Sequence, residues 1–564
     1  MINAHTYPPI SSFIWDLKYR LKAFDGFPLE HSIEDTWRRV AKSVASVERN
    51  KKYWEQKYFN AFTDFKLIPA GRISAGAGTK RNVTLINTFV MGIIPDNLEG
   101  IFDSLKESAL TLRQGGGIGC DFSTIRPAGS EIKGVESASN GPIPFMDLWD
   151  EMCGAIISAG VRRGAMMAML RCDHPDIEKF IIVKQKPGRL CKFNLSVLIT
   201  DKFMEAVEKD NNWDFVFNGK VYKTISAKSL WDKIMMMSYE YSEPGVIFID
   251  VINRLNNLHY CEYIIGTNSC GEQLLPPYGS CPLACINLSR LVDNPFQRNA
   301  KLNLEKLANL TSLGIRMLDD VLDITRYPLP MQEQESFSKR RVGLGITGLA
   351  DALVMCGVRY GSEKALRLTE EWMKTFQETS YMYSAELAKE RGCFPLYNEE
   401  FLKGKQAQNL PLKARKKIIK YKIRNAVLNS IPPTGTTSLY AGNISSGIEP
   451  IYSLTVSRKI LLPDGTHKEM NIDDFAFELF KSKKHTRKVP DHFVTSADLT
   501  PTEHIKMQAI AQKYVDSSIS KTINCPKDIS FEAFKDIYFQ AYKSGCKGCT
   551  TYRPSDVRGY VITT

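Results

Sequence analysis

The segment Thr267-Asn268-Ser269-Cys270-Gly271-Glu272-Gln273 carries an amide, a thiol and a carboxylate on alternate residues. Residues two apart in an extended loop point the same way, so Asn268, Cys270 and Glu272 could face one small substrate. A reactive thiol, a carboxylate that moves a proton and an amide that orients hydroxyl groups form a coherent catalytic set. A second thiol, Cys281, follows a Pro-Pro-Tyr-Gly turn. A turn-rich loop with a structural cysteine would show the same spacing, so the segment alone leaves both interpretations open.

Length and composition indicate a large globular protein. The chain has 564 residues, of which 43% are hydrophobic, and this length suggests roughly two to four domains. No apolar run reaches the roughly 18 residues of a membrane span, and residues 1–10 lack the pattern of a secretory signal. We therefore expect a soluble, cytoplasmic protein that does not bind membranes.

The thirteen cysteines are expected to be mostly reduced thiols, because nothing in the sequence indicates secretion. The Cys546-Lys547-Gly548-Cys549 pair has no second pair or nearby histidine that would complete a zinc site. We therefore predict no metal centre.

The net charge of +12 suits a protein that handles phosphorylated anions, and it would also suit a nucleic-acid binder. The densest basic run, residues 413–422, lacks the aromatic platform that single-stranded nucleic acids require. A solvated basic helix face explains it better, so we expect no nucleic-acid partner.

Residues 1–65 have a charged, helical pattern. From residue 68 onwards short apolar runs alternate with amphipathic segments, which is typical of an α/β domain. Helices are predicted at 304–324 and 363–391, and others are predicted to begin at Asp96, at Thr500-Pro501 and at Ser530. Predicted strands lie at 118–122, 166–170, 195–199, 246–249 and 426–431.

Two further segments suggest a phosphorylated ligand. Gly115-Gly116-Gly117-Ile118-Gly119 follows a predicted helix and precedes a strand, which is the reverse of a dinucleotide fingerprint. Its glycines either end the helix or let backbone approach a ligand. The hydroxyl-rich run of residues 430–438 would suit a phosphate cradle. Arg126, Arg162 and Arg163 could add contacts to phosphate.

Together these segments resemble the large catalytic subunit of ribonucleotide reductase, most closely its class II, adenosylcobalamin-dependent type. The resemblance runs from Pro69-Ala70-Gly71-Arg72-Ile73 to Gly548-Cys549-Thr550-Thr551-Tyr552-Arg553. It is strongest in Asn268-Ser269-Cys270-Gly271-Glu272-Gln273, Pro433-Thr434-Gly435-Thr436-Thr437-Ser438 and Ser446-Gly447-Ile448-Glu449-Pro450. It implies a ten-stranded α/β barrel over residues 66–564, with Cys270 on a central finger loop, after a small N-terminal helical region, residues 1–65.

The resemblance also implies a role for each catalytic residue. Cys270 would become a thiyl radical and remove the 3′-hydrogen of a ribonucleotide, with adenosylcobalamin as cofactor. Glu272 would accept the 3′-hydroxyl proton, Asn268 would hold the ribose hydroxyls, and Cys281 would belong to a reducing pair that ends as a disulfide. The implied substrate contacts are Asn87, Thr88, Gly116, Gly117, Thr434, Gly435, Thr436 and Thr437.

The sequence departs from the family pattern in its reducing thiols. Thr88 occupies the position expected for the second reducing cysteine, and threonine cannot form a disulfide. One hypothesis is that Cys120 supplies this thiol; the alternative is that Cys120 is a small buried hydrophobic residue. The usual C-terminal cysteine tail is not evident, so we expect that it is absent, encoded separately or replaced by a thioredoxin-like reductant.

Regulation can be predicted in part from the same resemblance. No ATP-sensing cone is evident at the N-terminus. For an effector, dNTP or ATP, the resemblance places Asp96 at the ribose and Arg126 at the phosphates. The loop of residues 184–192 would relay effector identity to the substrate site. The sequence is compatible with a monomer and with a homodimer.

Three other functions were weighed. A class I large subunit would need a separate radical-generating subunit, but Tyr552 and Tyr560 lack the adjacent tyrosine pair of that type. A regulatory paralogue that binds nucleotides without reducing them would be compatible with Thr88. A glycyl-radical enzyme is suggested only by Arg558-Gly559-Tyr560, without the zinc cysteines of that class. Whether the substrate is a diphosphate or a triphosphate stays open.

Overall fold

The structure is a computed structural model that describes residues 7–132, 134, 137–156, 164–461, 466–484 and 488–554. Arg162, Arg163 and Tyr560, considered above, lie outside these ranges. Within them, no helix is both long enough and apolar enough to cross a membrane.

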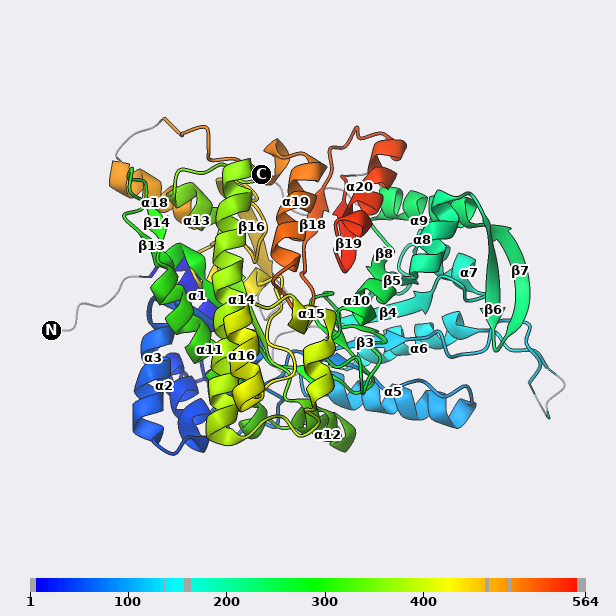
Figure 1. The fold of residues 1–564 in the computed structure, drawn as a ribbon, viewed down its shortest axis with the longest axis horizontal. Helices are drawn as coiled ribbons and strands as arrows, with labels where there is room; N and C mark the ends of the chain where they lie inside the picture. The colour runs from blue at the N-terminus through cyan, green and yellow to red at the C-terminus, as the bar shows by residue number, and fades with distance from the viewer. Residues whose placement is uncertain are drawn as a thin grey trace.

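Three helices form the N-terminal part of the chain: α1 (Pro9–Lys18), α2 (Ile33–Val44) and α3 (Lys51–Phe62). A capping box between Ser32 and Asp35 begins α2, since the two residues satisfy each other's backbone N–H groups. These helices lie at one end of the molecule, beside α11 (Leu304–Ile324) (Figure 1).

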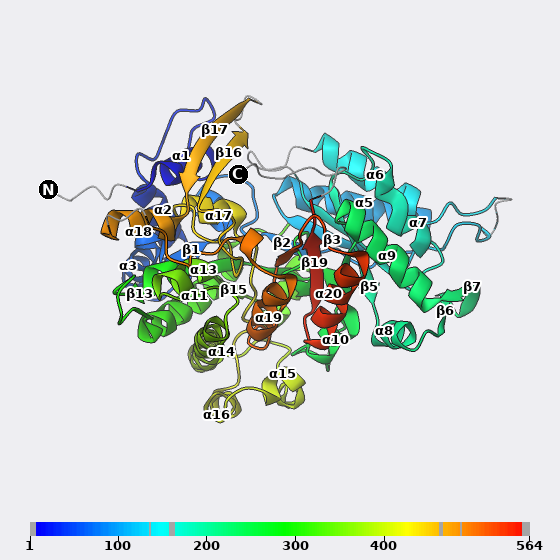
Figure 2. The ribbon, with the colours of Figure 1, turned by 90° about the horizontal axis from the view of Figure 1, so that it is seen from above.

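Five parallel strands form the first half of the sheet system. Their order is β2 (Thr88–Val90), β3 (Gly117–Asp121), β4 (Met166–Arg171), β5 (Phe193–Ile199) and β8 (Gly245–Phe248). The helices α5 (Leu98–Arg113), α6 (Pro142–Ala155), α8 (Asp201–Glu208) and α9 (Ala227–Tyr241) lie on the same side of the molecule as these strands (Figure 2). The buried outer side chains of this half pack with those of the helices in one hydrophobic core.

A second set of five parallel segments completes a ring. It runs from β12 (Leu283–Asn287) to β15 (Gly343–Thr347), then by single bridges to residues 429–431 and to residue 519, and on to β18 (Thr522–Asn524) and β19 (Gly548–Tyr552). At one seam β19 pairs antiparallel with β8. At the other, β11 (Ser280–Cys281) pairs antiparallel with β2 and continues through Pro282 into β12. The two sets therefore adjoin at both seams, as the strands of the expected ten-stranded α/β barrel do.

The strongest sequence signals gave the most accurate boundaries. The helix α11 and the long helix α14 (Glu363–Arg391) end where they were predicted, and α19 (Pro501–Gln512) and α20 (Phe531–Lys543) begin after the predicted caps Thr500 and Ser530. One cap was wrong. Asn97, not Asp96, accepts the Gly100 N–H at the start of α5, because Asp96 is engaged by Arg126.

Shorter elements connect these parts. The remaining helices are α4 (Gly71–Gly76), α7 (Ile177–Ile182), α10 (Ile249–Arg254), α12 (Pro330–Lys339), α13 (Leu349–Met355), α15 (Lys405–Gln408), α16 (Leu412–Tyr421), α17 (Gly435–Tyr440) and α18 (Phe475–Lys484). The remaining strands are β1 (Leu67–Pro69), β6 (Asn212–Phe217), β7 (Lys220–Ser226), β9 (Gly266–Thr267), β10 (Leu274–Leu275), β13 (Val292–Asp293), β14 (Lys301–Leu302), β16 (Thr455–Leu461) and β17 (His467–Asp473).

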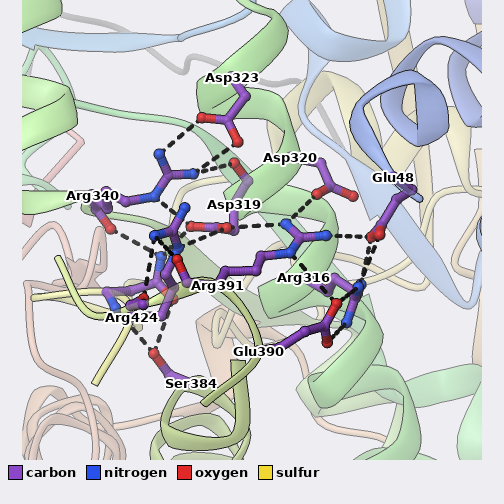
Figure 3. Close-up of polar contacts among 12 residues, drawn as sticks. Glu48, Arg316, Asp319, Asp320, Asp323, Arg340, Ser384, Glu390, Arg391 and Arg424 are labelled. Carbon is purple, nitrogen blue, oxygen red and sulfur yellow. Dashed lines mark hydrogen bonds and ion pairs between the residues drawn. The ribbon is translucent and has the colours of Figure 1, made fainter. Parts of the chain in front are cut away.

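A buried network of ion pairs connects the N-terminal helices to the barrel domain (Figure 3). Asp319 on α11 contacts Arg340 at 2.8 Å and both Arg391 and Arg424 at 3.2 Å. Glu48, which precedes α3, pairs with Arg391 at 2.6 Å and with Arg316. Burial alone would raise the pKa of Asp319, but the surrounding guanidinium groups outweigh it and hold that pKa below its usual value. Asp319 therefore stays charged, and the network joins α11, α14 and the N-terminal segment.

Candidate active site

The catalytic segment of the sequence forms a hairpin whose tip is Asn268–Gln273. Its strands β9 and β10 pair antiparallel, with Thr267 opposite Leu274. The Asn268 side chain accepts the Gln273 N–H at 3.0 Å, and Gly271 N–H donates to the Asn268 carbonyl at 3.2 Å. Gly271 adopts φ +83°, a conformation that favours glycine. Cys270 is exposed at the tip and Glu272 is buried.

Two glycines of β3 make room for this hairpin against the barrel wall. A β-carbon on Gly119 would lie 1.8 Å from the Thr267 carbonyl oxygen, and one on Gly117 would lie 3.0 Å from Ser269 Oγ. A side chain at either position would point into the barrel, so glycine there allows the finger loop to approach β3. The glycine run thus does more than end helix α5.

The opposite half of the barrel braces the hairpin. Gln273 Nε2 donates to Ser430 Oγ at 2.6 Å, and Leu274 N–H donates to Ser517 Oγ at 2.9 Å. Ser518 N–H donates to the Glu272 carbonyl at 2.9 Å. The finger loop is therefore fixed from both halves of the barrel, which limits the freedom of Cys270 and Glu272.

One cavity of about 450 Å³ gathers the predicted substrate residues, and we call it the nucleotide cavity. Its volume suits a small-molecule ligand. Its lining includes Asn268, Cys270, Glu272, Asn87, Thr88, Gly116, Gly117, Thr434, Gly435, Thr436 and Thr437. Residues from positions 87 to 437 of the sequence therefore meet at one place in the fold.

Glu272 is the acidic side chain among the described residues that line this cavity. Burial raises its pKa to about 7, although a hydrogen bond from Asn268 opposes the shift. Glu272 Oε2 and Asn87 Oδ1 are both buried and have no hydrogen-bond partner among the described residues. Unpaired buried acceptors are costly, and both line the cavity. Together they suit a ligand that presents hydroxyl donors.

The loop before α17 is held open by the Ser446–Pro450 segment. Thr434 adopts φ +50°, and its hydroxyl accepts the Gly447 N–H at 2.9 Å and contacts Thr347 Oγ1 at 3.1 Å. Ser438 Oγ and Ser446 Oγ lie 2.9 Å apart. These contacts hold the Thr434–Ser438 segment against the Ser446–Pro450 segment, so the two motifs form one local structure.

The two predicted redox thiols do not face each other. Thr88 is the direct cross-strand partner of Cys281, and its hydroxyl donates to the Cys281 carbonyl at 2.8 Å. Cys120 lies on β3 with its side chain in the outer core near Ser108 and Trp149. Because Gly117 and Gly119 occupy the inner positions of β3, alternation directs Cys120 outward. This direction favours the alternative that Cys120 is a small buried hydrophobic residue over the hypothesis that it pairs with Cys281.

Two lining residues were missed by sequence reasoning. Arg72 on α4 and Cys285 on β12 both line the nucleotide cavity. Cys285 lies four residues after Cys281 in an extended run, and this even spacing could have indicated a shared face. Arg72 lies within the Pro69–Ile73 motif. Helix α4 is too short for its apolar pattern to predict which way the Arg72 side chain points.

A second cavity of about 470 Å³ contacts Cys270 and also Ser269, Gly271 and Leu274 of the finger loop. Its wall includes Ser196, Gly245 and Thr550 on neighbouring strands. A β-carbon on Gly245 would lie 3.2 Å from Ser196 Oγ and 3.5 Å from Thr550 Oγ1. Glycine therefore leaves a cradle between two hydroxyl groups. Cys270 borders both cavities.

The predicted effector residues lie together near the start of α5. Arg126 Nε and Asp96 Oδ2 are 3.0 Å apart, and Asp96 Oδ1 accepts the Arg126 backbone N–H at 3.0 Å. In the loop of residues 184–192, Lys184 pairs with Glu243 and Arg189 pairs with Asp147 at 2.7 Å. No group of three or more His, Cys, Asp or Glu side chains in the described ranges is arranged to hold a metal ion.

Comparison with known proteins gives matches along nearly the whole chain. The model of the ribonucleotide reductase barrel domain matches residues 86–552, and the model of the ribonucleotide reductase all-alpha domain matches residues 8–82. A vitamin B12-dependent ribonucleoside-diphosphate reductase of Mycobacterium tuberculosis (strain CDC 1551 / Oshkosh) is 33% identical over 97% of this chain and 79% of its own length. The protein of the same name from Thermoplasma acidophilum is 33% identical over 96% of this chain and 70% of its own length. A ribonucleoside-diphosphate reductase subunit alpha of Chlamydia pneumoniae is 27% identical over 92% of this chain and 56% of its own length.

Proposed function

The chain belongs to the ribonucleotide reductase large-subunit family, and on this premise we propose that it reduces ribonucleotides to deoxyribonucleotides in the nucleotide cavity. The observation that carries the proposal is the pairing of an exposed thiol, Cys270, with a buried carboxyl, Glu272, whose free oxygen lines the same cavity. In this proposal residues 1–65 are a helical region and residues 66–564 form the reductase barrel domain.

The first chemical step uses Cys270 and Glu272. Cys270, as a thiyl radical, removes the 3′-hydrogen of the ribose, and Glu272 accepts the 3′-hydroxyl proton. A pKa of about 7 suits a group that both takes and returns a proton near neutral pH. Asn268 and Asn87 orient the sugar, because both line the cavity and carry amide groups that bind hydroxyls.

The second step removes the 2′-hydroxyl as water and needs two electrons. One ribonucleotide and two thiols give one deoxyribonucleotide, one water and one disulfide. Cys281 supplies one thiol and Thr88 cannot supply the other. Cys285 is four residues away on an extended run, about 13 Å, which is too far for a direct disulfide with Cys281. We therefore assign the second thiol to a thioredoxin-like dithiol. One of its thiols forms a mixed disulfide with Cys281 as the ribonucleotide is reduced, and its other thiol then displaces Cys281. This regenerates the Cys281 thiol and leaves the dithiol as a disulfide.

The cofactor that we propose is adenosylcobalamin, as the names of the relatives suggest. When bound, it would supply the one-electron chemistry that turns the Cys270 thiol into a thiyl radical. The second cavity fits its nucleoside group, because the cavity reaches Cys270 and has hydroxyl groups beside the space left by Gly245. Ser196, Gly245 and Thr550 would hold that group.

The same reasoning extends to substrate and regulation. We propose ribonucleoside diphosphates as substrates, with their phosphates on Thr434, Gly435, Thr436 and Thr437. A dNTP or ATP effector would bind at Asp96 and Arg126, and a homodimer is the proposed assembly.

The test is deoxynucleotide formation from each ribonucleotide, with adenosylcobalamin, a dithiol and matched effectors. Sustained product in the wild type and none in Cys270→Ser would support the proposal. Product that appears only after a separate radical-generating subunit is added would favour a class I enzyme. Nucleotide binding without product or cobalamin cleavage would favour a regulatory paralogue.

A further inference from the structure

Few of the described side chains that line the nucleotide cavity are charged. Among the described residues that line it, Arg72 is the single basic side chain and Glu272 is the single acidic one. The remaining lining groups are backbone, hydroxyl, amide, thiol or apolar. Among these described residues, Arg72 is therefore the one whose side chain can offer a polyanionic ligand a positive charge.

The local structure gives Arg72 a defined place. A β-carbon on Gly115 would lie 2.6 Å from Arg72 Cζ and 2.7 Å from its Nη1. The guanidinium group thus lies against the Gly115 backbone, in space that any other residue at position 115 would fill. Gly115 also adopts φ +102°, which favours glycine. Gly115, Gly116 and Gly117 line the same cavity, so the backbone there leaves room for both the guanidinium group and a ligand.

A cation in the lining would strengthen phosphate recognition in this cavity. The hydroxyl groups of Thr434, Thr436 and Thr437 are neutral donors, and the ionised Glu272 carboxylate repels phosphate. A guanidinium group matches phosphate oxygens with a planar pair of N–H donors and stays charged at every physiological pH. We infer that Arg72 binds the 5′-phosphates of the substrate and thereby discriminates ribonucleotides from unphosphorylated ribonucleosides. This inference rests on the proposed function, because it assigns the cavity to a ribonucleotide.

Opposite charges at Arg72 and Glu272 also orient the ligand. The phosphates are attracted to Arg72 and repelled by Glu272, whereas the neutral ribose can approach the carboxyl. The pair therefore disfavours the reversed pose, in which phosphate would lie beside Glu272. Arg72 is a binding and orienting residue and takes no part in the chemical steps.

The test is equilibrium binding without cofactor or turnover, measured by isothermal titration calorimetry. ADP and adenosine serve as probes, with dTTP present to saturate the effector site. We expect Arg72→Gln to weaken ADP binding about ten- to hundredfold, the range of a charged hydrogen bond, and to leave adenosine binding unchanged. Arg72→Lys should fall between the two. Arg81→Gln, at an exposed position, is the matched control and should bind like the wild type.

Two results would overturn the inference. In one, Arg72→Gln binds ADP as tightly as the wild type. In the other, ADP and adenosine weaken equally in Arg72→Gln, which would show a purely structural role. Failure of the proposed function would give a different result. The protein would then form no deoxynucleotide, but ADP binding would still depend on Arg72.

Discussion

Thr88 and Cys281 are direct neighbours across the antiparallel pair of β2 and β11, joined by a 2.8 Å hydrogen bond from the threonine hydroxyl to the cysteine carbonyl. Neighbours in such a pair have Cα atoms about 4.5 to 5.5 Å apart, within the range of about 4.4 to 6.8 Å found in disulfides. Positions 88 and 281 therefore have the spacing that a disulfide requires, but only position 281 holds a cysteine.

The variant Thr88→Cys should acquire the missing thiol. We expect it to form a disulfide with Cys281 on oxidation and to raise the number of turnovers supported by a small dithiol. Peptide mapping by mass spectrometry and multiple-turnover assays would measure both. Cys120→Ser is the control, since its thiol lies in the outer core. A Thr88→Cys protein that never forms the disulfide would contradict the pairing.

The variant Glu272→Gln should lose reductase activity by at least about a hundredfold, the usual scale of general acid–base catalysis. In the wild type, kcat should fall as the pH drops below about 7, because protonated Glu272 cannot accept the 3′-hydroxyl proton. A pH–rate profile with no limb near 7 would argue against this role for Glu272.

The same variant should be more stable than the wild type at high pH. In the folded protein the pKa of Glu272 is raised from its ordinary value of 4.5 to about 7, so the folded protein binds more protons than the unfolded chain between these values. Wild-type stability therefore falls as the pH rises through this window. Glu272→Gln should gain on the order of 1 to 3 kcal/mol at pH 8 relative to the wild type, and less at pH 5. Urea unfolding at both pH values would measure the difference.

The variant Gly119→Ala should displace the finger loop, because its β-carbon would lie 1.8 Å from the Thr267 carbonyl oxygen. We expect loss of activity together with a lower melting temperature. Gly154→Ala is the matched control, since its β-carbon would meet the Lys192 side chain at 3.4 Å, an ordinary contact. Equal activity in the two variants would show that the finger loop does not lie where the structure places it.

The variant Asp319→Ala should destabilise the protein by about 3 to 5 kcal/mol, the usual cost of removing one partner from buried ion pairs. It would leave Arg340, Arg391 and Arg424 without their shared carboxylate. Asp323→Ala, at a side chain that is 29% exposed, should cost much less. Chemical denaturation of both variants would test this difference.

The variant Phe102→Glu should weaken self-association if the homodimer uses helix α5. Leu98 and Phe102, one turn apart on α5, are 65% and 48% exposed, and neighbouring exposed apolar side chains can form part of a protein–protein contact. Sedimentation velocity would report the change in mass. Phe24→Glu, at another exposed position, is the control and should leave the association unchanged.

Parts of this structure follow directly from local sequence patterns. Helices α11 and α14 lie where they are predicted because of their long amphipathic periodicity, to which α14 adds a terminal glycine. The finger-loop residues and the Thr434–Thr437 loop can be singled out in the sequence because each short segment holds several side chains suited to catalysis or binding. Local patterns do not give the register of one strand against another, however. For that reason the direction of Cys120 was not predictable, and Arg72 was missed on a helix of six residues.

The arrangement of the barrel strands bears on assembly. A strand at the end of a sheet has backbone N–H and C=O groups that can pair with another chain. Here β11 and Pro282 lead from β2 to β12 at one seam, and β19 pairs with β8 at the other. Among the described strands, β1 ends the three-stranded sheet and has a single partner strand, β12, but it is three residues long and buried. It therefore offers little backbone to another protein, whether a second copy or a reductant. We expect such a partner to recognise side chains on the surrounding helices, hairpins and loops.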